Sequence, residues 1–251
     1  MKTLKYSIIA AFFSVLSLNL AAQEISQGFD LSLALGYNIG ATTPVPLPAE
    51  VRKINSYNPK FNPSLGINLN YGFNDKWGVG ASVLVDWKGM RVKDEVKYMH
   101  TSVTLVKGGD RLTGYFVGDN MTNVNMTYLT IPIYATYTFN PQWNVKLGIY
   151  AAKALSSGFD GNVNNGYIRI DSPTGQKQEI DGEGASFDFG EDIRDYDFGL
   201  MAGGEYRLNS RIGFYANLSW GLVPFFYKNT NPIEFTMTNI YGTIGITYRL
   251  K

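Results

Sequence analysis

Apolar and polar residues alternate along much of this chain, most clearly between Ser64 and Trp87. A period of two places each set on one face of a β-strand, and the short polar break Asn74-Asp75-Lys76 makes the two halves a hairpin. Each half has about eleven residues, enough to cross a bilayer core when tilted, whereas soluble sandwiches use strands of about five or six. The apolar row is Leu65, Ile67, Leu69, Tyr71, Phe73, Trp77, Val79, Ala81, Val83, Val85 and Trp87.

The same pattern recurs often enough to close a barrel. Long and short connections alternate between these segments along the chain, and the first connection is a long one. In a meander of eight strands this places four long loops on one side and three tight turns with both termini on the other. We therefore predict an all-β fold, an eight-stranded antiparallel up-and-down transmembrane β-barrel. Its strands are expected at residues 29–39, 64–73, 77–87, 129–139, 143–151, 196–208, 212–222 and 240–250.

The segments between these strands follow the pattern less well. Residues 41–62 and 156–193 are expected to be long irregular connections. Within residues 90–121 the alternation loosens, although Val103 and Leu105 fit a hairpin that rises beyond the membrane and turns at Gly108-Gly109-Asp110.

Two positions predict bulges in the fourth strand. Val124 and Met126 share a face with Tyr128, which is the wrong parity for a lipid-facing row, and a bulge near Tyr128 would repair it. Pro132 has no N–H to offer the hydrogen-bond ladder, which also predicts a bulge.

Charged residues near the middle of the predicted strands fall on the face opposite the apolar row. A charge near the bilayer midplane costs ~2–4 kcal/mol in lipid, so this face should line the lumen. Buried charges need partners, and eight strands leave an interior that side chains fill. We predict a polar lumen network rather than an open pore. Its expected members are Asp30, Asp86, Lys146, Asp195, Asp197, Glu205, Arg207 and Arg249.

Aromatic residues lie near the ends of the apolar rows. Such residues sit at the two membrane–water interfaces of transmembrane barrels. The expected interface aromatics are Trp77, Trp87, Trp143, Trp220, Tyr71, Phe73, Phe139 and Tyr248.

The N-terminal residues have the features of a secretory signal peptide. Lys2 and Lys5 precede an apolar run from Ile8 to Leu18, which is too short for a membrane-spanning helix, and small residues follow. We predict a cleavable signal peptide at residues 1–23 and one barrel domain at residues 24–251. The chain has no cysteine, which excludes a disulfide and a lipid-modified N-terminus. These features predict the bacterial outer membrane, with long loops extracellular and the short turns and termini periplasmic.

Charge adds one exclusion. The predicted signal peptide holds two of the 22 basic residues and no acidic one, so the mature chain has 20 basic and 21 acidic residues. Nucleic-acid binding favours a strongly basic surface. We therefore expect no nucleic-acid partner.

Several short motifs resemble those of the PorT-like outer-membrane β-barrel proteins of Bacteroidota. The segment Tyr128-Leu129-Thr130-Ile131-Pro132-Ile133 is similar to the YLxIP strand entry of that family. Asp197-Phe198-Gly199-Leu200 with Gly203-Gly204, and the final Tyr248-Arg249-Leu250, are similar as well. The resemblance covers the mature chain. It implies an eight-stranded outer-membrane barrel, for most members without an assigned activity, and it provides no functional residues to transfer.

One small cluster could carry hydrolytic chemistry. His100 and Ser102 share a face of a strand-like segment, and Glu95 is near in sequence. A His/Ser pair with an acid hydrolyses lipid in some small outer-membrane barrels, but a histidine at a hairpin tip explains the same residues without catalysis.

A second cluster resembles a degraded calcium loop. Asp160, Asn162, Asn164 and Asp171 occupy positions 1, 3, 5 and 12 of that pattern, but the glycine expected at position 6 is Asn165. A polar surface loop is the simpler interpretation.

Together these features predict a non-catalytic binding or structural role. We expect no cofactor and no metal. The expected partners are outer-membrane lipid and an envelope protein or ligand that engages the long outer loops. Three alternatives stay open: an accessory component of a protein-secretion apparatus, a narrow channel, and a lipid-modifying enzyme. The aromatics of the long loops either contact such a partner or pack on one another; they are Tyr115, Phe116, Phe225, Phe226 and Tyr227.

Overall fold

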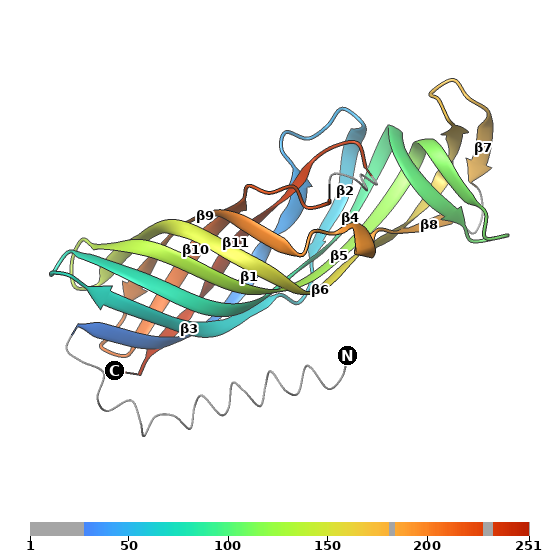
Figure 1. Cartoon of the computed structure of the whole chain (residues 1–251). Coiled ribbons are helices and arrows are strands. Elements are labelled where there is room, and N and C mark those ends of the chain that lie inside the picture. The colour runs from blue at the N-terminus through green and yellow to red at the C-terminus, as the bar shows by residue number, and fades with distance from the viewer. Residues whose placement is uncertain (1–27, 181–183, 228–232, 251) are drawn as a thin grey trace.

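The computed structural model describes residues 28–180, 184–227 and 233–250, which fold almost entirely into β-strands (Figure 1). The predicted signal peptide lies outside these residues. No helix in the described ranges is long and apolar enough to span a membrane. The elements are β1 (Phe29–Pro44), β2 (Val51–Pro59), β3 (Pro63–Gly72), β4 (Trp77–Leu105), β5 (Arg111–Thr138), β6 (Trp143–Ile170), β7 (Lys177–Ile180), β8 (Ala185–Asp188), the 3-10 helix η3 (Gly190–Asp192), β9 (Tyr196–Arg207), β10 (Ile212–Gly221) and β11 (Met237–Arg249).

Eight of these strands close into a ring in which every neighbour is antiparallel. The order around the ring is β1, β3, β4, β5, β6, β9, β10 and β11, and β11 pairs with β1 again. At the seam, Leu33 of β1 lies opposite Ile67 of β3 on one side and Tyr248 of β11 on the other. The predicted eight-stranded meander is confirmed. Ring closure leaves these strands without a free edge, so their backbone groups are satisfied within the sheet.

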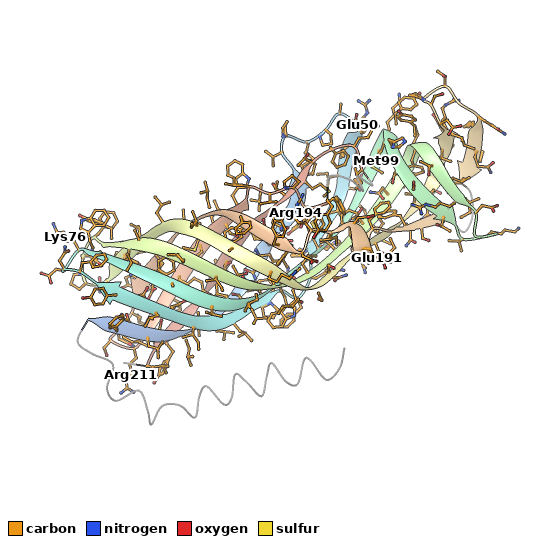
Figure 2. The ribbon with its side chains drawn as sticks, viewed as in Figure 1. Glu50, Lys76, Met99, Glu191, Arg194 and Arg211 are labelled. Carbon is orange, nitrogen blue, oxygen red and sulfur yellow. The ribbon has the colours of Figure 1, made fainter. Side chains whose placement is uncertain are left out.

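The three short connections of the barrel are built alike. In each, an asparagine side chain accepts hydrogen bonds from the backbone N–H groups two and three residues later, at 2.8–2.9 Å. The asparagines are Asn74, Asn140 and Asn209. Asparagine favours such turns because its side chain imitates a backbone acceptor. Lys76 and Arg211 mark this end of the molecule in Figure 2, and we call it the turn end.

The outer surface of the barrel is apolar from the turn end up to about the level of Trp87. Alternate residues of each strand point outwards, and many large apolar side chains there are exposed, such as Ile133, Leu147 and Leu218. Seven of the eight expected interface aromatics lie exposed on this surface, between 37% for Tyr71 and 64% for Phe139, whereas Trp87 is half-buried.

Three strands continue far beyond the barrel. β4, β5 and β6 have 29, 28 and 28 residues, about 90 Å of extended chain at ~3.3 Å per residue. β2 adds to the edge of β4, β7 pairs with β6, and β8 bridges β4 and β6. Glu50 and Met99 lie in this part of the molecule (Figure 2). We define the head as residues 41–62, 88–128, 152–195 and 222–239, as far as they are described.

The head corrects several expectations. The hairpin that turns at Gly108-Gly109-Asp110 is present, because β4 ends at Leu105 and β5 begins at Arg111. The connections at 41–62 and 156–193, expected to be irregular, instead hold β2, most of the outer part of β6, β7 and β8.

The two bulge predictions have different outcomes. The register of β5 against β6 shifts between Thr127 and Tyr128, as expected. The register of β4 against β5 continues unchanged past Pro132, so that bulge is not formed. The shift at Tyr128 does not return Val124 and Met126 to the outer face, because both side chains are buried inside.

The inside of the molecule changes character between barrel and head. In the barrel most inward side chains are polar, such as Asn68, Lys146 and Glu205. In the head the inward positions of β4 become Met90, Val96 and Met99, and the outward positions become Arg91 and Lys93. Phe116, Phe159 and Ile168 from β5 and β6 complete an apolar core. An apolar interior under a charged exterior is the pattern of a domain surrounded by water. Along one strand, therefore, the pattern inverts where the barrel ends.

Candidate functional site

The centre of the barrel is closed by paired charges. Lys146 Nζ lies 2.7 Å from Glu205 Oε2, with both side chains almost fully buried, and Thr247 donates to Glu205 Oε1 at 3.1 Å. Towards the turn end, Arg249 contacts Asp30 at 2.6 Å. Two opposite charges in a narrow interior satisfy one another and fill the space.

A second polar network lies nearer to the head. Asp197 Oδ2 accepts hydrogen bonds from Tyr150 Oη at 2.9 Å and from Asn239 Nδ2 at 3.0 Å. Asp86 accepts one from Asn38 Nδ2 at 3.2 Å. The partners come from different strands of the ring, so the network ties the wall together.

Lys88 seals the lumen where the head begins. Its side chain is buried, and Nζ lies 5.2–5.5 Å from the ring centres of Tyr128, Tyr150 and Tyr241. Such cation–π contacts stabilise a desolvated cation by about 2 kcal/mol. The predicted lumen network does not include Lys88, although strand parity places this residue in the inward row with Asp86.

One of the expected lumen residues lies outside the lumen. Asp195 precedes β9, which begins at Tyr196, and lies exposed with its carboxylate 2.9 Å from the exposed Lys153. The chain is irregular just before β9, so strand parity does not hold Asp195 inside, and its assignment to the lumen is wrong. Arg207 is half-buried and lines a polar cavity of about 470 Å³ at the turn end, together with Asp30 and Asn144.

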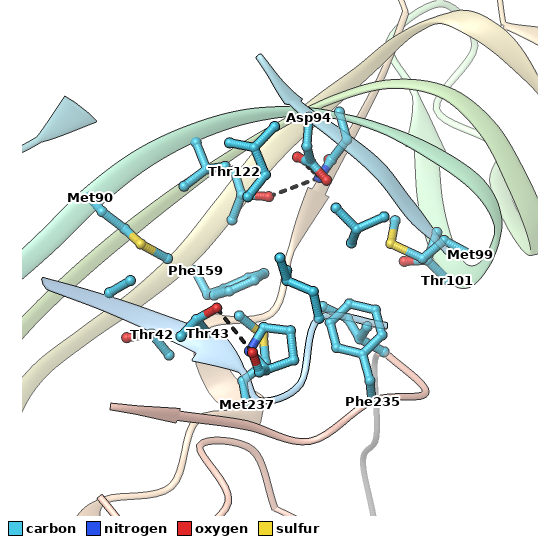
Figure 3. A pocket seen from close by; sticks show the side chains of 18 of the residues that line it. Thr42, Thr43, Met90, Asp94, Met99, Thr101, Thr122, Phe159, Phe235 and Met237 are labelled. Carbon is cyan, nitrogen blue, oxygen red and sulfur yellow. Dashed lines mark hydrogen bonds between the residues drawn. The ribbon is translucent and has the colours of Figure 1, made fainter. Parts of the chain in front are cut away.

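The head contains a separate apolar cavity of about 210 Å³ (Figure 3). It lies between the outer ends of β1, β2, β4, β5 and β6, with β8 and residues 233–237 closing it. The lining is almost wholly apolar and includes Met90, Met99, Phe159, Phe187 and Met237.

A polar pair interrupts this lining. Asn120 Nδ2 donates to Asp94 Oδ1 at 3.0 Å and to Thr122 Oγ1 at 3.1 Å. Burial raises the pKa of Asp94 to about 6, and the hydrogen bond from Asn120 only partly opposes that rise. Asp94 lies seven residues beyond Trp87 on β4, within the head.

The sequence matches the family described as "Outer membrane protein beta-barrel domain" over residues 21–227. The chain belongs to this family. It is thus a β-barrel protein of the bacterial outer membrane, and narrower membership among the PorT-like proteins stays a prediction. None of the curated proteins matches the sequence.

Solved structures of similar fold share little sequence with this outer-membrane barrel. Ail of Yersinia pestis, in complex with the heparin analogue sucrose octasulfate, has 14% identity and a TM-score of 0.36 over 90% of this chain and 99% of that chain. OprG of Pseudomonas aeruginosa has 12% identity and a TM-score of 0.36, with 88% and 96% covered. Neisserial surface protein A has 10% identity and a TM-score of 0.33, with 90% and 99% covered.

The residues that could have carried hydrolysis have separate partners in this barrel. Ser102 Oγ lies 2.7 Å from Thr113 Oγ1, and His100 Nδ1 lies 4.0 Å from Glu234. Glu95 accepts a hydrogen bond from Asn55. The arrangement does not link the three groups into a proton-transfer chain.

The residues of the degraded calcium-loop pattern do not form a calcium-binding loop either. Asp160, Asn162 and Asn164 lie along the extended strand β6 rather than in a loop, and Asp171 follows the end of that strand. Asp160 accepts a hydrogen bond from Asn123 at 3.2 Å. No cluster of three or more acidic, histidine or cysteine ligands occurs in the described ranges.

Most of the long-loop aromatics belong to the interior of the head. Phe116, Phe225 and Phe226 are buried in its core, whereas Tyr115 packs against the ring of His100. Tyr227 packs against the guanidinium of Arg194 at 5.0 Å. The interpretation that these residues pack on one another therefore holds for the buried phenylalanines.

Proposed function

We propose that this outer-membrane barrel is a non-catalytic binding protein that carries a folded head on the outer side of the cell. The observation that supports the proposal most directly is the inversion at Lys88. On the turn-end side of Lys88, charged side chains and tyrosines close the middle of the barrel. On the other side, an apolar core builds a head with its own cavity. A protein evolved only to span the membrane would not need the head.

The outward orientation of the head follows from the positions of the turns and chain ends. β1 begins and β11 ends at the turn end, where the three short connections also lie (Figure 1). Outer-membrane barrels keep short turns on the periplasmic side and long extensions on the outer side.

The closure of the lumen in the middle of the barrel argues for binding rather than transport. The cavity near Tyr134 and Lys146, in the middle of the barrel, measures about 20 Å³, close to the space of one water molecule. Ion passage would require the Lys146–Glu205 pair and the tyrosines around Lys88 to separate.

Conductance in planar lipid bilayers tests this proposal. We expect no steps above the lipid background for the wild-type protein, because side chains close the barrel at two levels. Replacing Lys88 and Tyr241 by alanine together removes the upper closure only, and the Lys146–Glu205 pair should still keep the barrel closed. Regular conductance steps in the wild-type protein would contradict the proposal and favour the channel alternative.

A further inference from the structure

The cavity of the head is large enough for a small molecule. Its volume of about 210 Å³ exceeds the ~150 Å³ of an engineered apolar cavity that binds benzene in another protein. Side chains from strands on several sides converge on it, so it depends on the whole head rather than on one loop. Leu47 and Ile54 line it while being about half exposed, and they provide an apolar entrance.

A hydrogen-bond acceptor in the lining of this space has no matching donor. The bonds from Asn120 Nδ2 to Asp94 and Thr122 use both amide hydrogens and fix the orientation of the amide. Asn120 Oδ1 is left buried with no hydrogen-bond partner in the described structure. Asn120 is 8% exposed and Asp94 is 7% exposed, so solvent does little to satisfy either group. A buried unmatched acceptor is costly.

The charge in the cavity has no counter-ion. Asp94 is the only charged side chain among the described lining residues, and Tyr57 is the only other titratable one. The ion pairs seen in the described ranges involve other residues. A ligand with one cationic group and an apolar body would complement both the carboxylate of Asp94 and the apolar walls.

We propose that the cavity binds a small apolar molecule that carries a protonated primary amine. The ammonium group, which has three N–H donors, donates to the carboxylate of Asp94 and to Asn120 Oδ1. The apolar part of the ligand packs among Met99, Phe159 and Phe187. This inference rests on the proposed binding role of the head and assigns the class of ligand.

Methyl NMR of the protein in phosphatidylcholine nanodiscs tests the inference directly. Three methionines line the cavity, Met90, Met99 and Met237, whereas Met201 lies in the barrel interior and serves as an internal control. Three probes of similar size differ in charge: 2-phenylethylamine, 2-phenylethanol and phenylacetate. At pH 7.5 we expect saturable shifts of the three cavity methyls with the amine, at least tenfold weaker binding of the alcohol, and none of the acid.

Two variants separate a specific site from an unselective apolar space. Asp94→Asn should weaken binding of the amine at least tenfold and leave the alcohol nearly unchanged. Glu95→Gln, one residue away on the outer face, should change neither. Protonation removes the charge of Asp94, so amine binding should also weaken below pH about 6. Equal binding of all three probes, or an Asp94→Asn protein that keeps its amine affinity, would overturn the inference. Either result would leave the closed lumen and the orientation of the head untouched.

Discussion

Replacing Asp94 by asparagine should stabilise the head at neutral pH when no ligand is bound in its cavity. The carboxylate is buried without a cation, and burial raises its pKa from 3.8 to about 6. One pKa unit corresponds to 1.36 kcal/mol, so ionised Asp94 destabilises the folded head by about 3 kcal/mol at pH 8. The amide carbonyl that the substitution introduces can still accept the hydrogen bond from Asn120, while the buried charge is gone.

The stability of the wild-type head should fall as the pH rises, because the pKa of Asp94 is raised by folding. A carboxyl whose folded pKa is raised stabilises the fold fully below the unfolded value of 3.8 and loses that contribution as the pH rises through about 6. The wild-type head should therefore weaken by about 3 kcal/mol between pH 3.8 and pH 8 through this group. Asp94→Asn lacks that dependence, so the two proteins should differ most at pH 8 and converge near pH 4.

Urea unfolding in detergent micelles measures this difference. The methyl resonances of Met90 and Met99 report on the head, and Glu95→Gln is the control because Glu95 is a neighbouring acid on the outer face. A variant that is no more stable than wild type at pH 8, or one whose added stability is the same at pH 4, would show that ionised Asp94 does not destabilise the head.

Two further predictions concern the barrel. Lys146→Met leaves Glu205 buried without its partner and should cost about 3–5 kcal/mol in urea unfolding, whereas the double change Lys146→Met with Glu205→Leu should recover most of that loss; equal costs for the single and double variants would contradict the pairing. Asp195→Ala removes only an exposed ion pair and should change stability by less than about 1 kcal/mol, whereas Asp197→Ala leaves the buried Tyr150 hydroxyl and one N–H of the Asn239 amide without their acceptor and should cost at least about 2 kcal/mol. The opposite ranking would support a place for Asp195 in the lumen.

The barrel could be predicted from sequence because two environments act on every strand. Lipid requires an apolar outer face and the narrow lumen accepts polar groups, so Leu65 to Trp87 can be interpreted residue by residue. Three turns with asparagine at the same position fix the register between neighbouring strands.

The head could not be predicted in the same way, for a physical reason. A period of two shows which residues share a face but not which face lies inside. The rule that apolar residues face outwards holds for Val79 or Ile133 and fails for Met90 and Val124, where the surroundings change from lipid to water. The parity change near Tyr128 is visible in the sequence. It can be interpreted only once the boundary between lipid and water is known, because the apolar face lies outside in lipid and inside in water.

The cavity depends on contacts that are distant in sequence. Asp94 and Asn120 are 26 residues apart and meet because the β4–β5 hairpin places them in register. Phe187 and Met237 reach the same space from other parts of the chain. Asn120 stands in a segment without clear alternation, and nothing in the sequence around it indicates a cavity.

The proposed orientation places the head outside the cell and the short turns in the periplasm. The chain has no cysteine, so single cysteines introduced at Gly109 in the head and at Asp75 in a short turn can be labelled in whole cells with a membrane-impermeant maleimide. We predict that Gly109→Cys is labelled in intact cells and that Asp75→Cys is labelled only after the outer membrane is permeabilised. Labelling of Asp75→Cys in intact cells, with Gly109→Cys protected, would show that the head lies in the periplasm.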